Sequence, residues 1–354
     1  MAHQPLLEVT RGRIVESVHY GSIAVVDSNG ELIASHGDPQ TVAFLRSSAK
    51  PFQVLPFVER GGVEHFHFSQ RELALACASH EGSALHVQTV SALQQRIGLS
   101  ESDLQCGAHL PGDVAEFKAM IVHDSHPTAN YNNCSGKHTA MLAHAKMRGL
   151  PLDTYLDPGH PVQQDILASF AEMCQIPVPQ VELGTDGCSA PNFAVPLYNA
   201  ALGFARLSDP QALSESRAAA CRKITAAMSA FPEMVSGFGE FDEQLMKVCR
   251  GRVVTKRGAE GFQIVGVLPG AMRMDAPGLG IAIKVADGDA ARMADDLTFH
   301  NRVRPAVTLE ILRQLGILST EEAQALAGFG PVKEIRNHRD LLTGRSRPVF
   351  SLGM

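Results

Sequence analysis

Apolar residues at the two ends of the chain fall into short runs of strand length. Residues 21–27 (GSIAVVD) and 31–37 (ELIASHG) flank the triplet SNG, whose Asn29-Gly30 pair favours a tight hairpin turn. Runs of the same character recur at residues 252–258, 262–268 and 278–288. The pattern predicts a sheet built from both ends of the chain, from about residues 1–46 and 250–354.

The middle of the chain has helical periodicity. Ser69 and Glu72 stand at capping-box spacing at the start of an apolar run, and helical periods follow at residues 160–174 and 214–228. Two more helical segments are expected after the last strands, at residues 291–316 and 319–328. Because strands and helices alternate poorly, we expect an α/β fold with a largely antiparallel sheet flanked by helices, plus a mainly helical part at about residues 50–249.

Composition narrows the class of protein. The 354 residues are 45% hydrophobic, which is enough for a large core, and no linker or repeat divides them, so we expect a single domain over residues 1–354. The net charge of −6, without a run of like charges, indicates no nucleic-acid partner and no membrane surface. Seven cysteines, with no export signal and no transmembrane run, are typical of cytoplasmic thiols, some of them candidate metal ligands.

The first chemical candidate lies in residues 44–53 (FLRSSAKPFQ). A serine three residues before a lysine is the spacing of one class of hydrolase nucleophile, and Pro51 fits the first turn of a helix that begins near Ser47. Ser47 and Lys50 would then share one helix face, within hydrogen-bond reach. The alternative is a helix cap beside a surface lysine, because about one such pair is expected by chance.

Two further polar clusters lie at the ends of predicted helices. Ser79 and Glu81, in residues 76–85 (ACASHEGSAL), end an apolar helix, where serine and glycine are also ordinary turn residues. Cys134, Lys137 and His138 stand at i, i+3 and i+4, on one face if the segment is helical, with Ser135 or Asn133 as its cap. Cysteine and histidine this close are candidate metal ligands, although a buried free cysteine is the commoner outcome.

Two later segments contain further candidate functional residues. Residues 182–193 (ELGTDGCSAPNF) are rich in turn formers and contain Asp186 and Cys188, which would supply a second thiolate. Lys256 ends a predicted strand beside Gly258, as a lysine does in the Lys-Thr-Gly element of penicillin-recognising hydrolases, but Arg257 replaces the threonine here. An ordinary lysine at a strand end is the alternative.

Taken in order, five segments resemble the asparaginase II family, the group similar to the zinc-containing, inducible L-asparaginase of rhizobia. They are residues 46–53 (RSSAKPFQ), 78–82 (ASHEG), 132–142 (NNCSGKHTAML), 185–193 (TDGCSAPNF) and 256–261 (KRGAEG). The resemblance spans nearly the whole chain, and long motifs in a fixed order are far more specific than one pair of residues. It implies a fold similar to serine β-lactamases and glutaminases, and a homodimer.

The resemblance also implies roles for named residues. It pairs Ser47 with Lys50 and Ser79 with Lys256, and it assigns zinc to Cys134, Lys137 and Cys188. Spacing alone would favour His138 over Lys137 as the third ligand. The expected substrate contacts are Arg46, Glu81, Asp186 and His138.

The expected activity is hydrolysis of L-asparagine to L-aspartate and ammonia. A glutaminase or a penicillin-recognising serine hydrolase on the same fold is the alternative enzyme, and a zinc- or metabolite-binding protein without catalysis is the alternative class. The sequence leaves open which serine–lysine pair supplies the nucleophile and whether the metal is catalytic or structural.

Overall fold

The computed structural model describes residues 3–290, 292–293 and 299–353. Contacts divide the chain into two compact units, each described here by itself. The sheet unit comprises Met1–Leu45, Val195–Asp209 and Gln244–Met354, and the helical unit comprises Arg46–Ala194 and Pro210–Glu243. Residues 195–209, which the sequence assigns to the mainly helical part, therefore belong to the sheet unit.

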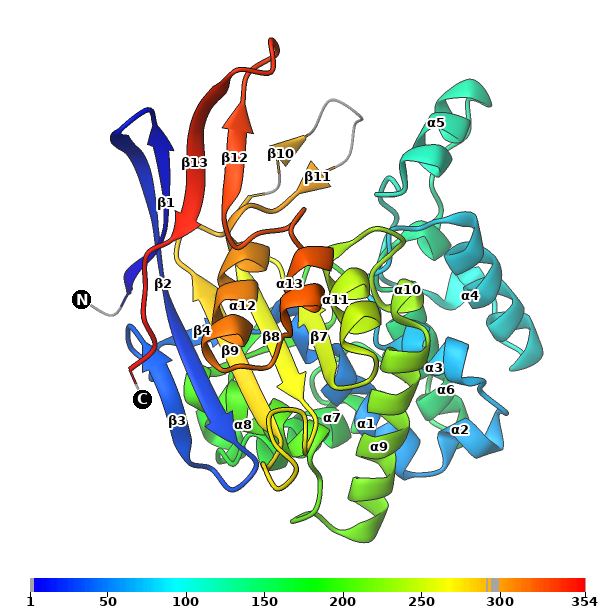
Figure 1. The fold of residues 1–354 in the computed structure, drawn as a ribbon. Helices are drawn as coiled ribbons and strands as arrows, with labels where there is room; N and C mark the ends of the chain where they lie inside the picture. The colour runs from blue at the N-terminus through cyan, green and yellow to red at the C-terminus, as the bar shows by residue number, and fades with distance from the viewer. Residues whose placement is uncertain (1–2, 291, 294–298, 354) are drawn as a thin grey trace. The chain divides into compact units, whose positions relative to one another are not determined.

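The sheet unit contains an antiparallel sheet in the order β12-β13-β1-β2-β9-β8-β7, with β3 paired to β2 (Figure 1). Its strands are β1 (Gln4–Arg11), β2 (Ile14–Asp27), β3 (Leu32–His36), β7 (Val253–Arg257), β8 (Phe262–Val267), β9 (Leu279–Val285), β12 (Lys333–Arg336) and β13 (Leu342–Pro348). Shorter strands are β4 (Val42–Phe44) and the pair β10 (Arg292–Met293) and β11 (Phe299–His300). Strands from both ends of the chain thus share one sheet, as predicted.

Two helices of the sheet unit pack on this sheet. Helix α8 (Leu197–Ser208) contacts β2, β8 and β9, and α12 (Val303–Gln314) contacts β1, β8, β9 and β13; α13 (Thr320–Ala325) follows. A Cβ on Gly280 would lie 1.8 Å from the Ala201 carbonyl oxygen, so only glycine allows α8 to approach β9 this closely. Gly266 pairs with Gly280 on the neighbouring strand, and a Cβ there would lie 2.0 Å from Ser208 Oγ of α8.

The strand register places Lys256 on the face that α8 covers. Lys256 lies opposite Ile264, and Ile264 is two residues from Gly266, which meets α8. Side chains two residues apart on a strand share a face. Lys256 is buried and is the second-last residue of β7, close to the strand end that the sequence predicts.

The helical unit is built around α1 (Lys50–Glu59), which packs against α6 (Ser135–Met147), α7 (Pro161–Met173) and α9 (Glu215–Ala230). The remaining helices are α2 (Gly62–His65), α3 (Gln70–Ala76), α4 (Ala84–Arg96), α5 (Val114–Val122) and α10 (Pro232–Val235), and α11 (Phe241–Cys249) leads out of the unit. Strands β5 (Glu182–Thr185) and β6 (Pro191–Pro196) pair antiparallel. A Cβ on Gly136 would lie 2.3 Å from the Leu75 carbonyl oxygen, so this glycine lets α6 pack closely on α3.

Most elements agree with the sequence. The predicted α/β class, with an antiparallel sheet flanked by helices and a helical region, is confirmed, as are the hairpin between β2 and β3 and the Ser69–Glu72 capping box of α3. The helix predicted over 291–316 is wrong in its first part: residues 292–293 and 299–300 are strands, the helix begins at Val303, and residues 291 and 294–298 lie outside the described residues. Among the described residues, none of the helices has the length and hydropathy needed to span a bilayer.

Candidate active site

The entry into α1 is a strained turn. Arg46 has a φ of 52°, in the left-handed region that non-glycine residues rarely adopt, and a short 3-10 turn (Arg46–Ala49) follows before α1 begins at Lys50. The Arg46 amide donates a hydrogen bond to Asn192 Oδ1 (3.1 Å), which ties the turn to β6. Strained residues of this kind concentrate at functional sites. Pro51 occupies the first turn of α1, as predicted, while the helix continues past Pro56 to Glu59.

Lys50 is the central polar residue of the helical unit. Its side chain is 1% exposed, and its Nζ donates to the Ala78 carbonyl (2.5 Å), to Ser79 Oγ (2.8 Å) and to the Asn133 carbonyl (3.1 Å). One amine thus joins the first three sequence motifs. The serine that Lys50 contacts is thus Ser79. In the described part of the chain no hydrogen bond links Lys50 to Ser47, and the Ser47–Lys50 pairing stays a prediction.

The surroundings of Lys50 favour its neutral form. Burial lowers the pKa of Lys50 from its ordinary value, and although the Cys134 sulfur opposes this change, the Lys137 cation adds to it. A lysine can act as a base only when its amine is neutral. The lowered pKa moves Lys50 towards the neutral amine, whose two N–H groups can donate to the Ala78 and Asn133 carbonyls while its lone pair faces Ser79 Oγ, so Lys50 is a candidate general base.

The loop that carries Ser79 is held in place by three hydrogen bonds that sequence reasoning missed. The Ser79 amide donates to the Val235 carbonyl (2.9 Å). The Gly82 amide donates to His80 Nδ1 (3.1 Å), which assigns the ring proton to Nε2, and Nε2 donates to Ser135 Oγ (2.9 Å) at the start of α6. His80 stands inside the ASHEG motif, but only the distant partner Ser135 reveals its role.

Two cysteines and a lysine meet beside Lys50. Cys134 itself is the N-cap of α6, which corrects the prediction that Ser135 or Asn133 caps this helix. One turn into the helix, Lys137 Nζ donates to Cys188 Sγ (3.0 Å), in the loop between β5 and β6. All three side chains are buried. The structure thus brings together the three residues that the family resemblance assigns to zinc.

Cys134, Cys188 and Lys137 shift one another's pKa values. A hydrogen bond from the Cys188 thiol, with the Lys50 and Lys137 amines nearby, holds the pKa of Cys134 well below its ordinary value, while the same hydrogen bond raises the pKa of Cys188. Burial alone would lower the pKa of Lys137, but the two sulfurs reverse this and raise it. Cys134 is therefore the more acidic of the two thiols and Lys137 is held in its charged form, so groups of opposite charge lie together in the protein interior.

Arg46 and Asp186 form an ion pair at the edge of this cluster. Both Nε and a terminal nitrogen of Arg46 lie 2.8 Å from Asp186 Oδ1, which also accepts from the Gly187 amide at 2.8 Å. Burial by itself would raise the pKa of Asp186, but Lys137 and Arg46 lower it below its ordinary value. The pair therefore remains charged at neutral pH and presents a cation and an anion side by side.

Three predicted residues remain: His138, which adjoins Cys188, and Glu81 and Lys256. His138 is buried, its Nδ1 is 2.6 Å from the Tyr155 hydroxyl, and burial lowers its pKa to about 4, so it is neutral at physiological pH. Glu81 packs between two glycines: a Cβ on Gly112 or Gly237 would lie 1.5 Å or 2.6 Å from its side chain. Lys256 belongs to the sheet unit, where its Nζ donates to the Arg257 carbonyl (3.1 Å).

The donor set near Cys134 can be compared with what metals require. Among the described residues, no three histidine, cysteine, aspartate or glutamate side chains gather in a way that would hold a metal ion. The two sulfurs and the Lys137 amine form a different set, in which two soft thiolates suit zinc. The amine must lose its proton to become a ligand, so the set fits zinc only if metal binding releases protons.

A family model described as L-asparaginase II matches residues 7–348 of this chain. The chain belongs to the L-asparaginase II family. Membership over nearly the whole length makes the protein an amidohydrolase, in agreement with the resemblance carried by its five motifs.

Two of the solved structures with some similarity to this chain are a glutaminase and a probable glutaminase from Bacillus subtilis. One from Bacillus subtilis (YbgJ), in covalent complex with 5-oxo-L-norleucine, is 11% identical, with 84% of this chain and 89% of that chain covered and a TM-score of 0.38. A probable glutaminase from Bacillus subtilis with 6-diazo-5-oxo-L-norleucine is 12% identical, with 84% of both chains covered and a TM-score of 0.39. None of the curated proteins compared matches the sequence.

The burial of Lys50 predicts a pH-dependent stability. Unfolded lysine titrates near about 10.4, and the folded pKa is lower, so between the two values the unfolded state binds more protons. Stability therefore rises with pH through this window. Urea unfolding near pH 6 and pH 9 should show that the free energy of unfolding of wild type, relative to Lys50→Met, becomes more favourable at the higher pH.

The matched control is Lys118→Met, which removes an exposed lysine on α5 and should leave the difference from wild type independent of pH. An equal difference between wild type and Lys50→Met at both pH values would mean that Lys50 keeps its ordinary pKa, which would contradict the account of its burial.

Proposed function

We propose that this amidohydrolase is an L-asparaginase that hydrolyses L-asparagine to L-aspartate and ammonia with a serine nucleophile activated by lysine. The observation that carries the proposal is the buried Lys50 amine, 2.8 Å from Ser79 Oγ and at the start of the helix entered through Ser47. Family membership supports amide hydrolysis. Family membership alone does not identify the substrate. We choose asparagine because charged groups near Lys50, described below, suit its α-ammonium and α-carboxylate.

The first step is attack by a serine oxygen on the side-chain amide carbon of the substrate. Ser47 is a weak nucleophile as an alcohol, and a neutral Lys50 amine accepts its proton as the new C–O bond forms. The lowered pKa of Lys50 supports this role. When the tetrahedral intermediate collapses, the C–N bond breaks and the nitrogen leaves as ammonia after receiving a proton. Water then cleaves the acyl ester, releases aspartate and restores the serine.

Ser79 is placed to move a proton in this scheme. Its hydroxyl accepts a hydrogen bond from Lys50, so the proton taken from Ser47 can pass through Ser79 to the leaving nitrogen. We assign Lys256, paired with Ser79, to keep this hydroxyl oriented. The reversed arrangement, in which Ser79 attacks and Ser47 assists, is decided by mutation below.

Asparagine carries an α-ammonium and an α-carboxylate in addition to its amide. We assign the α-carboxylate to Arg46 and the α-ammonium to Asp186 or Glu81. The Arg46–Asp186 ion pair supports this assignment because it presents both charges at one place, next to the helix entry that carries Ser47. His138, neutral at physiological pH, completes the proposed substrate contacts without adding charge.

We further propose that Cys134, Lys137 and Cys188 hold one zinc ion, as in the zinc-containing, inducible-type (class 3) members. The 3.0 Å contact between Lys137 and Cys188 and the thiolate at Cys134 support this ligand set. Zinc bound there would orient the substrate or act as a Lewis acid. A homodimer and a cytoplasmic location are also part of the proposal.

Release of ammonia by purified protein tests the function directly. Asparagine should be hydrolysed, and glutamine and a chromogenic β-lactam should be hydrolysed at least about tenfold more slowly, a discrimination of about 1.4 kcal/mol. Faster turnover of glutamine would make the protein a glutaminase. No ammonia from either amide, with stoichiometric zinc, would leave a binding protein.

Substitution of the serines identifies the nucleophile. Ser47→Ala should lower kcat by a factor on the order of 10³ or more, because no other group replaces an attacking oxygen. Ser48→Ala is the matched control and should retain most turnover, since its neighbour keeps the Lys50 spacing. Retained turnover in Ser47→Ala together with loss in Ser79→Ala would reverse the two roles.

Elemental analysis tests the zinc site. One zinc per chain is expected, and Cys134→Ser and Cys188→Ser should each lose most of it, because removing one thiolate from a three-ligand site weakens it severely. His138→Ala should keep the metal if Lys137 is the third ligand. Stoichiometric zinc in the double cysteine variant would place the site elsewhere.

A further inference from the structure

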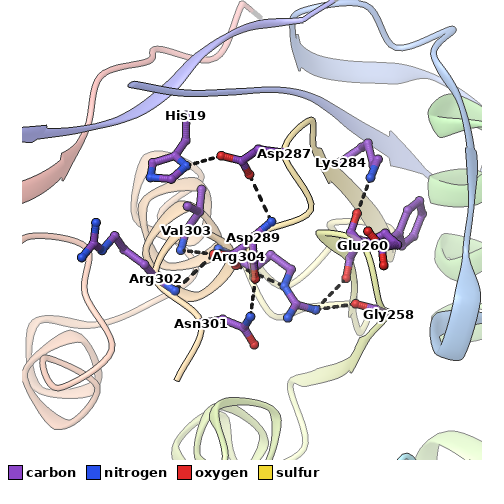
Figure 2. Close-up of polar contacts among 11 residues, drawn as sticks. His19, Gly258, Glu260, Lys284, Asp287, Asp289, Asn301, Arg302, Val303 and Arg304 are labelled. Carbon is purple, nitrogen blue, oxygen red and sulfur yellow. Dashed lines mark hydrogen bonds and ion pairs between the residues drawn. The ribbon is translucent and has the colours of Figure 1, made fainter. Parts of the chain in front are cut away.

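A buried carboxylate holds the start of α12 in the sheet unit (Figure 2). Asp289 Oδ1 accepts from the Arg302 amide (3.2 Å) and the Val303 amide (3.0 Å), and Oδ2 accepts from the amide (2.9 Å) and Nε (3.2 Å) of Arg304. Asp289 and Arg304 are 4% and 6% exposed. The carboxylate therefore caps the helix and fixes the guanidinium at the same time.

The fixed guanidinium reaches the turn that follows β7. One terminal nitrogen of Arg304 donates to the Gly258 carbonyl (2.5 Å) and to the Phe262 carbonyl (3.2 Å). These residues are the two ends of the turn, because the Gly258 amide itself donates to the Phe262 carbonyl (2.8 Å). Figure 2 shows Arg304 directed from α12 towards Gly258.

Strand β9 holds the middle of the same turn. Lys284 Nζ donates to the Glu260 carbonyl, and the Val285 amide donates to the Gly261 carbonyl (2.9 Å). Gly261 has a φ of +71°, and a Cβ there would lie 2.7 Å from the Val285 carbonyl oxygen. The middle of the turn is thus anchored on β9, while Arg304 contacts both of its ends.

Lys256 lies two residues before the Gly258 carbonyl. It is fully buried on β7, so the surrounding side chains and backbone restrict the position of its amine. A shift of the Gly258 peptide would rotate the end of β7 and displace the Lys256 amine. Displacements of about 1 Å at a reacting group cost about 10²-fold in rate.

We propose that Arg304, held by Asp289, is a positioning residue for Lys256: it fixes the end of β7 so that the Lys256 amine stays where proton transfer requires it. The inference rests on the proposed function in one respect, the assignment of Lys256 to orient the Ser79 hydroxyl for proton transfer. Asp289 and Arg304 act on the turn that follows β7, so their proposed effect passes through Lys256.

A double-mutant cycle tests the route of this effect. Arg304→Lys keeps the charge that pairs with Asp289 but loses the planar group that bonds both carbonyls. We expect Arg304→Lys to lower kcat for asparagine by about tenfold or more with KM changed less than about twofold. In a Lys256→Arg background, where the amine is already displaced, adding Arg304→Lys should lower kcat by less than about twofold.

Arg252→Lys is the matched control, because Arg252 also pairs with a carboxylate (Glu322) and donates to a carbonyl (Ile317, 2.8 Å), but just before the opposite end of β7. It should leave kcat unchanged. If Arg304→Lys does not fold, Asp289→Asn is used in its place. Amide hydrogen exchange over residues 256–262 should then be faster than in wild type, while exchange in the rest of β8 and in β9 should not change.

Three results would overturn the inference: unchanged kcat in Arg304→Lys, an equal loss in the wild-type and Lys256→Arg backgrounds, or unchanged exchange over residues 256–262 in Asp289→Asn. Lys256→Met separates this failure from that of the proposed function. If Lys256→Met keeps wild-type turnover, Lys256 has no part in proton transfer and both ideas fall. If Lys256→Met loses turnover while the effects of Arg304→Lys and Lys256→Arg are additive, only the positioning role of Arg304 is rejected.

Discussion

The burial of one amine, that of Lys50, is the constraint on which the helical unit depends. An amine removed from water must find acceptors, and those of Lys50 come from three chain segments: the carbonyls of Ala78 and Asn133 and the hydroxyl of Ser79. The same burial that demands these partners also lowers the pKa of the amine. One physical cause therefore gathers the motifs in space and prepares the base that the proposed chemistry needs.

The charges around Lys50 follow from the same constraint. A second buried lysine, Lys137, would be costly next to the first unless an anion accompanied it, and the sulfurs of Cys134 and Cys188 supply that anion. Because Lys137 keeps its proton in this set, it raises the cost of protonating Lys50. Binding of the proposed zinc ion would release two protons, one from the Lys137 ammonium and one from the remaining cysteine thiol, so the two charges of the metal would replace two protons and the net charge of the cluster would not change.

Local patterns predicted much of this, and long-range contacts account for what they missed. The hairpin at Asn29-Gly30 and the strand that ends just after Lys256 follow from short-range periodicity and turn chemistry, and the structure confirms both. The contact of Lys50 with Ser79 could not be predicted, because a spacing of three residues points to Ser47 while folding brings in a residue 29 positions away. Likewise, nothing local at Arg304 reveals its bonds to the Gly258 and Phe262 carbonyls, since only packing of α12 brings them together.

The central claim, that a serine beside the buried Lys50 attacks the substrate, is tested most directly by covalent trapping. The protein would be incubated with a diazoketone analogue of asparagine, and the modified residue would be located by peptide mass spectrometry. The account predicts one adduct per chain, on Ser47, that excess asparagine prevents and that does not form in Lys50→Met. An adduct on a cysteine, or ammonia release from asparagine in a protein whose serines are never labelled, would contradict it.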